Sequence, residues 1–189
     1  MDFKKLFRPF AVLAAVSLVS FSFTSCGDDD EDDGDTPADV QNPKSAMAFY
    51  EFGASQDMVD VLDITISYAD NGEIKTEKMT STTWSATAKG DVLPATFGYK
   101  IHMKVKDNAD FSKGSFDFIT NTYSTQYAVY DEKGNRIDEL SKKGESAAEG
   151  KLTGLKEEGI KKAFADRVYI NEGFEIGTDG KFTKKTINW

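Results

Sequence analysis

The sequence predicts a mainly β fold, an antiparallel β-sandwich with one short helix near the C-terminus. Apolar and polar residues alternate in short segments with a period of two, as in strands buried on one face. Turn signals separate these segments at intervals of roughly ten residues, and only residues 152–167 show helical spacing. An immunoglobulin-like sandwich fits this pattern, although the single cysteine excludes the immunoglobulin Cys–Trp–Cys spacing. A small β-barrel is the alternative.

The first part of the domain is predicted to consist of antiparallel strands joined by short turns. The expected strands cover residues 46–52, 58–69, 73–79 and 82–88. In the second of them, two valines have the opposite parity from the alternating apolar residues that follow, which predicts a bulge near residues 60–62. Asn71 and Gly72 then form the strongest short hairpin signal in the chain.

The clearest strand signal covers residues 95–106, after a turn that ends at Pro94. Its apolar and basic residues fall on opposite sides, so we expect an antiparallel strand with one buried and one hydrated face. The residues expected to be buried are Phe97, Tyr99, Ile101, Met103 and Val105. Those expected to be exposed are Lys100, His102, Lys104 and Lys106.

Weaker signals fill the rest of the domain. The expected elements are a loop at 107–114, strands at 115–121 and 125–131, a loop at 140–150, a helix at 152–167, and a final hairpin of strands at 168–176 and 182–189. The helix is predicted from apolar residues that share one face, and from Glu157, which precedes Lys161 by four residues and can pair with it.

The N-terminal 25 residues are organised like a secretory signal peptide. Three basic residues among the first eight precede a run of 15 residues at 9–23 that is apolar apart from three serines, and the small residues Thr24 and Ser25 follow it. A membrane-spanning helix would need about 20 apolar residues. Acidic residues, rather than a basic cluster, follow this run, which also favours a signal peptide.

The motif Phe23-Thr24-Ser25-Cys26 resembles the lipobox of bacterial lipoproteins, although Phe23 replaces the usual leucine. The resemblance implies that cleavage occurs before Cys26, that its sulfur receives a diacylglyceryl group, and that its amino group is acylated, for example with palmitate. Several acyl chains would anchor the protein stably to outer-membrane lipid. The alternative, a buried unmodified thiol, conflicts with the acidic neighbours of Cys26. The predicted organisation is a signal peptide at 1–25, an acidic flexible tether at 26–42 and one domain at 43–189.

The tether carries most of the negative charge. It holds eight acidic residues and no basic ones, whereas residues 43–189 have 23 acidic and 20 basic residues. Six of the tether acids directly follow Gly27, which resembles the export signal of surface-exposed lipoproteins in Bacteroidota and implies that the domain faces the cell exterior. A solvated linker is the alternative, and a calcium loop would need spaced ligands and a turn glycine. The balanced domain has no basic stripe, so we expect no nucleic-acid partner.

The domain offers few residues for catalysis. His102 is the only histidine, and the sequence places lysines beside it rather than a group that would orient it as a base. One histidine and one lipidated cysteine leave too few ligands for a transition metal, and no phosphate-binding glycine loop or Gly-x-Ser-x-Gly motif is found. We therefore expect no metal, no cofactor and no enzyme activity. A polysaccharide-acting enzyme that uses two carboxylates is the remaining enzymatic alternative.

Aromatic residues are the candidates for ligand binding. Trp84, Tyr127 and Trp189 are predicted to form a stacking surface for a sugar, although Trp84 shares its strand face with alanines and also fits a core position. The favoured function is a non-catalytic, lipid-anchored binding or adhesion module on the cell surface, with a glycan or an envelope protein as its ligand. The alternative is a structural or accessory subunit of an outer-membrane complex, in which an exposed strand edge pairs with a partner.

Overall fold

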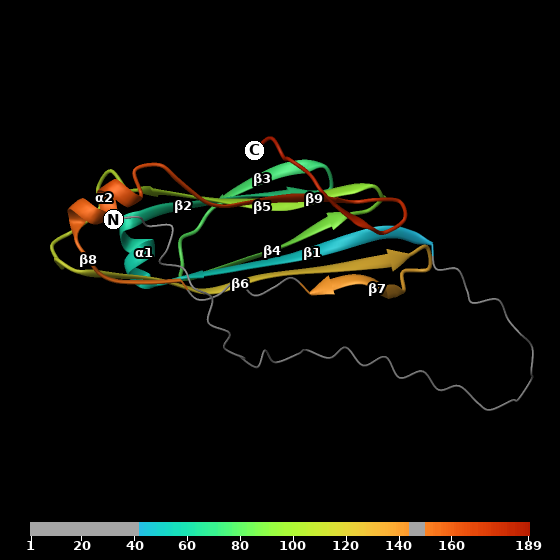
Figure 1. The fold of residues 1–189 in the computed structure, drawn as a ribbon, viewed down its shortest axis with the longest axis horizontal. Helices are drawn as coiled ribbons and strands as arrows, with labels where there is room; N and C mark the ends of the chain where they lie inside the picture. The colour runs from blue at the N-terminus through green and yellow to red at the C-terminus, as the bar shows by residue number, and fades with distance from the viewer. Residues whose placement is uncertain (1–41, 144–149) are drawn as a thin grey trace, which may run out of the picture.

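The computed structural model describes residues 42–143 and 150–189, and it consists of two antiparallel sheets packed face to face (Figure 1). The predicted β-sandwich is therefore confirmed. The first sheet has the order β4-β1-β6-β7, with β8 also paired to β6, and the second has the order β10-β9-β5-β2-β3. The signal peptide, Cys26 and nearly all of the tether lie outside the described residues, so the predictions made for them stay predictions.

In the described residues, each of the two sheets contains five strands. The first sheet contains β1 (Pro43–Ala54), β4 (Thr83–Gly90), β6 (Phe116–Asp131), β7 (Arg136–Lys143) and β8 (Gly150–Leu155). The second contains β2 (Leu62–Asp70), β3 (Glu73–Lys78), β5 (Ala95–Val105), β9 (Arg167–Ile176) and β10 (Phe182–Lys184). This order differs from the immunoglobulin constant-type arrangement, in which strands 1-2-5-4 face strands 3-6-7.

The predicted two-sided character of β5 is confirmed. Phe97, Tyr99, Ile101 and Met103 are each at most 1% exposed, whereas Lys104 on the opposite face is exposed. The prediction is too strict for four residues, because Val105, at the end of the strand, is half-buried rather than buried, and Lys100, His102 and Lys106 are half-buried rather than exposed. These inward side chains meet Tyr50 and Phe52 of the first sheet and the apolar residues of β2, all in one core. Because β5 lies between β2 and β9, it forms the centre of the second sheet.

The prediction of one strand over residues 58–69 is wrong in its first part. Residues Gln56–Val61 form helix α1, and β2 begins only at Leu62. Met58, Val59 and Val61 are buried, and Met58 and Val61 are three residues apart, which places them on one helical face. The irregular parity that predicted a bulge therefore marks the change from a helix to a strand.

Two strands were predicted where the structure has one. β6 continues as one strand across residues 122–124, because it pairs with β1 from Pro43 opposite Asp131 to Ala54 opposite Thr120, with a register shift between Tyr123 and Thr120. The local sequence pattern predicts a gap between two strands at these polar residues. Pairing with β1, which is distant in sequence, extends β6 through them.

The predicted loop at 140–150 and helix at 152–167 also need correction. β7 reaches Lys143, β8 covers Gly150–Leu155, and helix α2 is limited to Glu157–Ala163. Gly154 has a φ of +67°, a left-handed conformation that cannot continue an α-helix. At the C-terminus, β10 has only three residues, and residues 185–189 leave the predicted strand.

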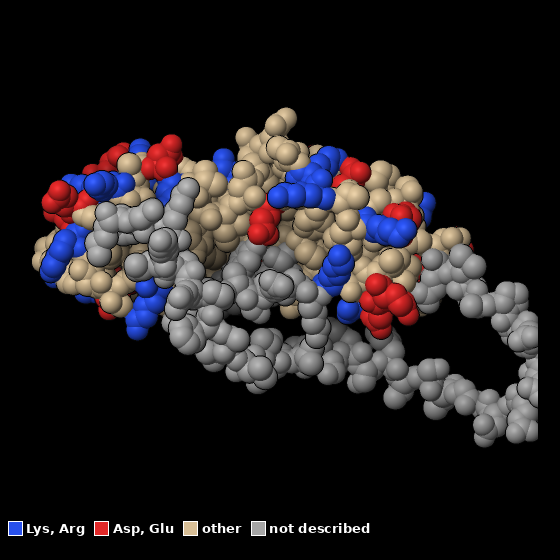
Figure 2. All heavy atoms as spheres, in the orientation of Figure 1, with Lys and Arg blue, Asp and Glu red and all other residues tan. Residues whose placement is uncertain are grey.

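The two ends of the sandwich differ. α1, α2, β8 and the loop at 106–115 gather at one end, on the left in Figure 1, whereas β1 starts at Pro43 at the other end. On the face shown in Figure 2, acidic and basic side chains are interspersed, as the nearly balanced composition predicts. Within residues 42–143 and 150–189, no helix has the length and apolar character needed to cross a membrane.

Candidate functional site

Trp84 is a buried residue at the edge of the sandwich, 9% exposed. Its ring lies against the ring of Tyr68 on β2, with centroids 5.6 Å apart. Its Nε1–H donates to Oε2 of Glu77 on β3 at 2.8 Å. The Trp84 ring and its polar atom therefore both contact residues of the second sheet.

Glu77 joins the two sheets at this edge. In addition to the Trp84 bond, its Oε1 accepts a hydrogen bond from the Tyr68 hydroxyl at 2.7 Å. The donors on Trp84 and Tyr68 stabilise the carboxylate and hold the pKa of Glu77 below its usual value. Burial, assisted by the Glu77 bond, raises the pKa of Tyr68 to about 12. We call Glu77, Trp84 and Tyr68 the edge clasp.

Replacing Glu77 with glutamine should make the domain less stable at neutral pH and remove part of its acid sensitivity. A carboxyl group whose pKa falls on folding stabilises the fold above its unfolded pKa, and this contribution is lost as pH falls through about 4.3 and below. Because Glu77 is solvent-exposed, we expect a loss of only about 1 kcal/mol at pH 7.

Urea unfolding at neutral pH and at roughly pH 3.5 measures this difference. The gap in unfolding free energy between wild type and Glu77→Gln should narrow at the lower pH. Glu73→Gln on the same strand is the matched control, with an expected change under about 0.5 kcal/mol. A Glu77→Gln penalty that is independent of pH would contradict the role of the carboxylate charge.

Tyr127 lies in the core rather than on a binding surface. It is 9% exposed, and its ring packs edge-on against Phe174, with centroids 4.4 Å apart. Phe182 and Tyr50 also contact this ring, at 5.5 and 6.4 Å between centroids. Tyr127 therefore contributes to the packing of β6 on the second sheet.

Trp189 is half-buried, and it belongs to the C-terminal segment that follows β10. Its Nε1–H donates to Oδ1 of Asn171 on β9 at 2.7 Å. Trp84 and Tyr127 thus lie in the core while Trp189 lies beside β9, and the structure does not bring the three together into one surface. Ligand binding by them stays a prediction.

His102 has an orienting partner that the sequence does not reveal. Its Nε2 lies 2.5 Å from Oδ1 of Asp166, which follows α2 and is 64 residues away in the chain. The Asp166 side chain is 83% exposed, so the pair lies open to solvent. Within residues 42–143 and 150–189, no three His, Cys, Asp or Glu side chains are grouped to hold a metal ion.

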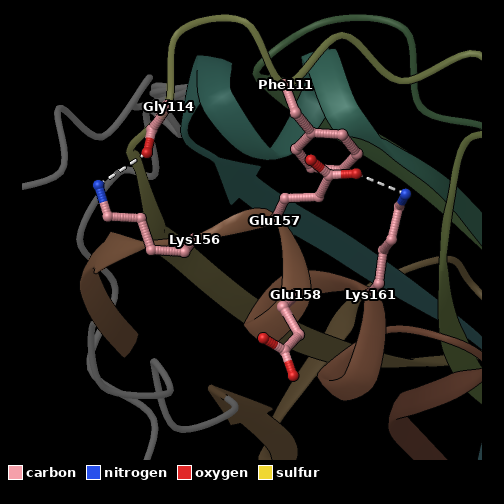
Figure 3. Close-up of a pocket in the computed structure, with 6 residues that line it drawn as sticks. All are labelled: Phe111, Gly114, Lys156, Glu157, Glu158 and Lys161. Atoms are coloured by element: carbon pink, nitrogen blue, oxygen red, sulfur yellow. Dashed lines mark hydrogen bonds and ion pairs between the residues drawn. The ribbon is translucent and has the colours of Figure 1, made fainter.

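A hollow of about 530 Å³ lies at the helical end of the sandwich, between α2 and the loop at 106–115 (Figure 3). Its lining residues are Phe111, Gly114, Lys156, Glu157, Glu158 and Lys161. Nζ of Lys161 bonds Glu157 Oε1 at 2.6 Å and lies 5.4 Å from the centre of the Phe111 ring. The hollow therefore combines an aromatic ring with charged groups of both signs.

Contacts with distant elements hold the loop that carries Phe111. Phe111 packs edge-on against Phe116 at the start of β6, with ring centroids 5.5 Å apart. Lys113 pairs with Asp57 of α1 at 2.5 Å, and Asp57 also accepts the Asp117 N–H at 2.7 Å. The Asp117 N–H and the Lys113 amine hold the pKa of Asp57 below its usual range. The hollow is thus built on a fixed loop, and the sequence signals only a polar loop there.

A second opening, between the sheets near the same end, is much smaller. It measures about 30 Å³ and is lined mainly by apolar side chains, with Thr120 and Arg167 among its polar residues. Such a volume holds one water molecule rather than a larger ligand. Of these two openings, the hollow at α2 has the size of a ligand site.

The hollow between α2 and the loop at 106–115 is therefore the candidate ligand site. Comparison of the chain with protein-family models, curated proteins and solved structures finds no significant match.

Proposed function

We propose that the chain is a lipid-anchored, non-catalytic binding module of the cell surface, and that it recognises a glycan or an envelope protein through the hollow at α2. The observation that supports this most directly is the hollow itself. Its volume of about 530 Å³ lies within the range of about 300–1,000 Å³ that is usual for ligand sites. An aromatic ring beside amines and carboxylates offers both stacking and hydrogen bonding to a polar ligand.

The positions of the tether and the hollow, at opposite ends of the sandwich, support the same function. The proposed tether at 26–42 ends where β1 begins, and the hollow lies at the opposite end of the sandwich (Figure 1). A tether of this length reaches at most about 60 Å when extended. Lipid anchored at Cys26 would therefore attach the domain through the start of β1, at the end opposite the hollow, so that the attachment itself does not cover the hollow.

Expression in a bacterial host that processes lipoproteins tests the anchor. Wild type should incorporate a labelled fatty acid and partition with the outer membrane, whereas Cys26→Ala should do neither. Equal soluble fractions of the two proteins would overturn the anchor without bearing on the hollow.

A glycan array and a pull-down from the native envelope test the hollow. Glu158→Lys should weaken binding of the captured ligand by at least about tenfold, because it reverses a charge in the lining. Glu132→Lys, an exposed residue in the turn between β6 and β7, is the control with the same charge change. If Trp189→Ala abolished ligand binding while Glu158→Lys bound as well as wild type, the binding site would lie at the C-terminal segment instead.

A structural or accessory subunit of an outer-membrane complex is the second candidate. The observation that favours it is β3, one of the two edge strands of the second sheet, because all six of its residues are exposed. An exposed strand edge can accept a partner strand by main-chain hydrogen bonding. A stoichiometric envelope partner together with a silent glycan array would favour this candidate.

A further inference from the structure

The edge of β3 presents unpaired backbone groups in a defined order. β2 and β3 pair from Asp70 opposite Glu73 to Thr65 opposite Lys78, and the Met79 N–H donates to the Ile64 carbonyl at 2.8 Å. Hydrogen-bonded pairs alternate along an antiparallel ladder, so the odd-numbered residues of β3 bond to β2. The N–H and C=O groups of Ile74, Thr76 and Lys78 therefore point away from the sheet.

The charges on β3 are complementary to those of a second, antiparallel copy in one register. The strand reads Glu-Ile-Lys-Thr-Glu-Lys over Glu73–Lys78. When a two-fold axis passes at Thr76, the outward groups of Ile74, Thr76 and Lys78 meet those of the second copy. In this register Lys75 lies opposite Glu77 of the second copy, and the same pair recurs across the axis. Cross-strand pairs of opposite charge stabilise a sheet, and like charges destabilise it.

The neighbouring registers are disfavoured by the same residues. An axis at Lys75 would place Lys75 opposite itself and Glu73 opposite Glu77 of the second copy. An axis at Glu77 would place Glu77 opposite itself. An axis at Ile74 would align only residues 73–75 of β3 with one another. The charges that protect this edge from non-specific pairing thus leave one full-length register open.

We propose that two copies of this chain associate through β3 as a two-fold symmetric dimer, in which their five-stranded second sheets join into one continuous sheet. Ile74, which is 42% exposed, is partly covered in the dimer by the aliphatic stem of Lys78 from the second copy. Glu77 keeps its bonds to Trp84 and Tyr68, because a carboxylate has lone pairs left for Lys75. The dimer rests on β3 alone and does not depend on the ligand proposed for the hollow.

Sedimentation equilibrium of residues 27–189 tests the dimer, since this part of the chain contains the whole core and lacks the only cysteine. The mass should approach twice that of the monomer as the concentration rises to about 1 mM, a range that includes weak contacts. Thr76→Pro should give a monomer, because it removes an outward N–H at an edge position where proline leaves the ladder to β2 intact. Thr76→Val loses the same hydroxyl contact with Ser67 but keeps the N–H, so it should still dimerise.

Cysteine cross-linking tests the register independently of the Thr76→Pro variant. On oxidation, Thr76→Cys should form a disulfide-linked dimer, because the two Thr76 Cα atoms would lie about 5.5 Å apart across the axis. Lys75→Cys, whose counterpart would be Glu77, should cross-link at least about tenfold more slowly. A monomeric mass at every concentration, a dimer that persists in Thr76→Pro, or faster cross-linking through Lys75→Cys would overturn the proposal.

Discussion

Ile101→Ala is expected to lower the free energy of unfolding by about 2–5 kcal/mol. Ile101 is fully buried on β5, at the centre of the second sheet, so its truncation removes apolar contacts and leaves a cavity. Urea unfolding followed by tryptophan fluorescence measures the loss.

Lys104→Ala on the same strand is the matched control for Ile101→Ala. The Lys104 side chain is exposed on the opposite face, and its truncation should cost under about 0.5 kcal/mol. If both variants lost similar stability, the assignment of one buried and one hydrated face to β5 would be wrong.

Gly98→Ala should destabilise the domain by about 3 kcal/mol or more, because a methyl group has no room there. Gly98 has a φ of +150°, and an added Cβ would lie 2.2 Å from the Glu172 carbonyl oxygen and 2.7 Å from Gly173 Cα. The side chain of Ile187 closes the same space, with its Cδ1 at 2.8 Å. To accommodate the added methyl group, both the backbone of β9 and the C-terminal segment would have to move.

Gly134→Ala separates conformational strain from this close contact. Gly134 also has a positive φ, +83°, but no atom lies within 4 Å of its added Cβ. Its replacement should therefore cost only about 1–2 kcal/mol from the left-handed backbone. Equal losses in the two glycine variants, measured by urea unfolding, would show that the contacts around Gly98 are unimportant.

The order of apolar, polar and turn residues predicts those elements of the fold that depend on residues close together in the sequence. In β5, a period of two separates the buried Tyr99 and Ile101 from Lys104, which is exposed as predicted, and from Lys100, which is half-buried. The turn at Asn71 and Gly72 adopts positive φ at both residues, as the hairpin signal requires. These features depend on residues that are close in sequence.

Elements that depend on distant partners were not predictable in this way. Residues 122–124 continue β6 because β1 supplies a ladder from more than 60 positions earlier. The segment that became β8 lies beside Phe118 of β6, and local helical spacing therefore gave the wrong element there. Tertiary pairing outweighed intrinsic preference in both cases.

The candidate site was even less visible in the sequence than the fold. Phe111 stands in a polar loop, and its importance comes from α2, which approaches it only after folding. The same holds for Asp166 beside His102 and for Glu77 beside Trp84, since nothing in the sequence links these pairs. By contrast, the interpretation of Cys26 rests on contiguous residues, and it stays a prediction until acylation is measured.

The direction of β1 has a mechanical consequence. If the tether pulls at Pro43 while a ligand holds the opposite end of the sandwich, the load runs along the length of β1. β1 pairs with β4 on one side and β6 on the other, and these ladder bonds lie perpendicular to the strand. Such a pull strains many hydrogen bonds in shear at the same time instead of opening them one after another. If the proposed anchor and the proposed ligand site are both correct, this geometry would resist force applied between them.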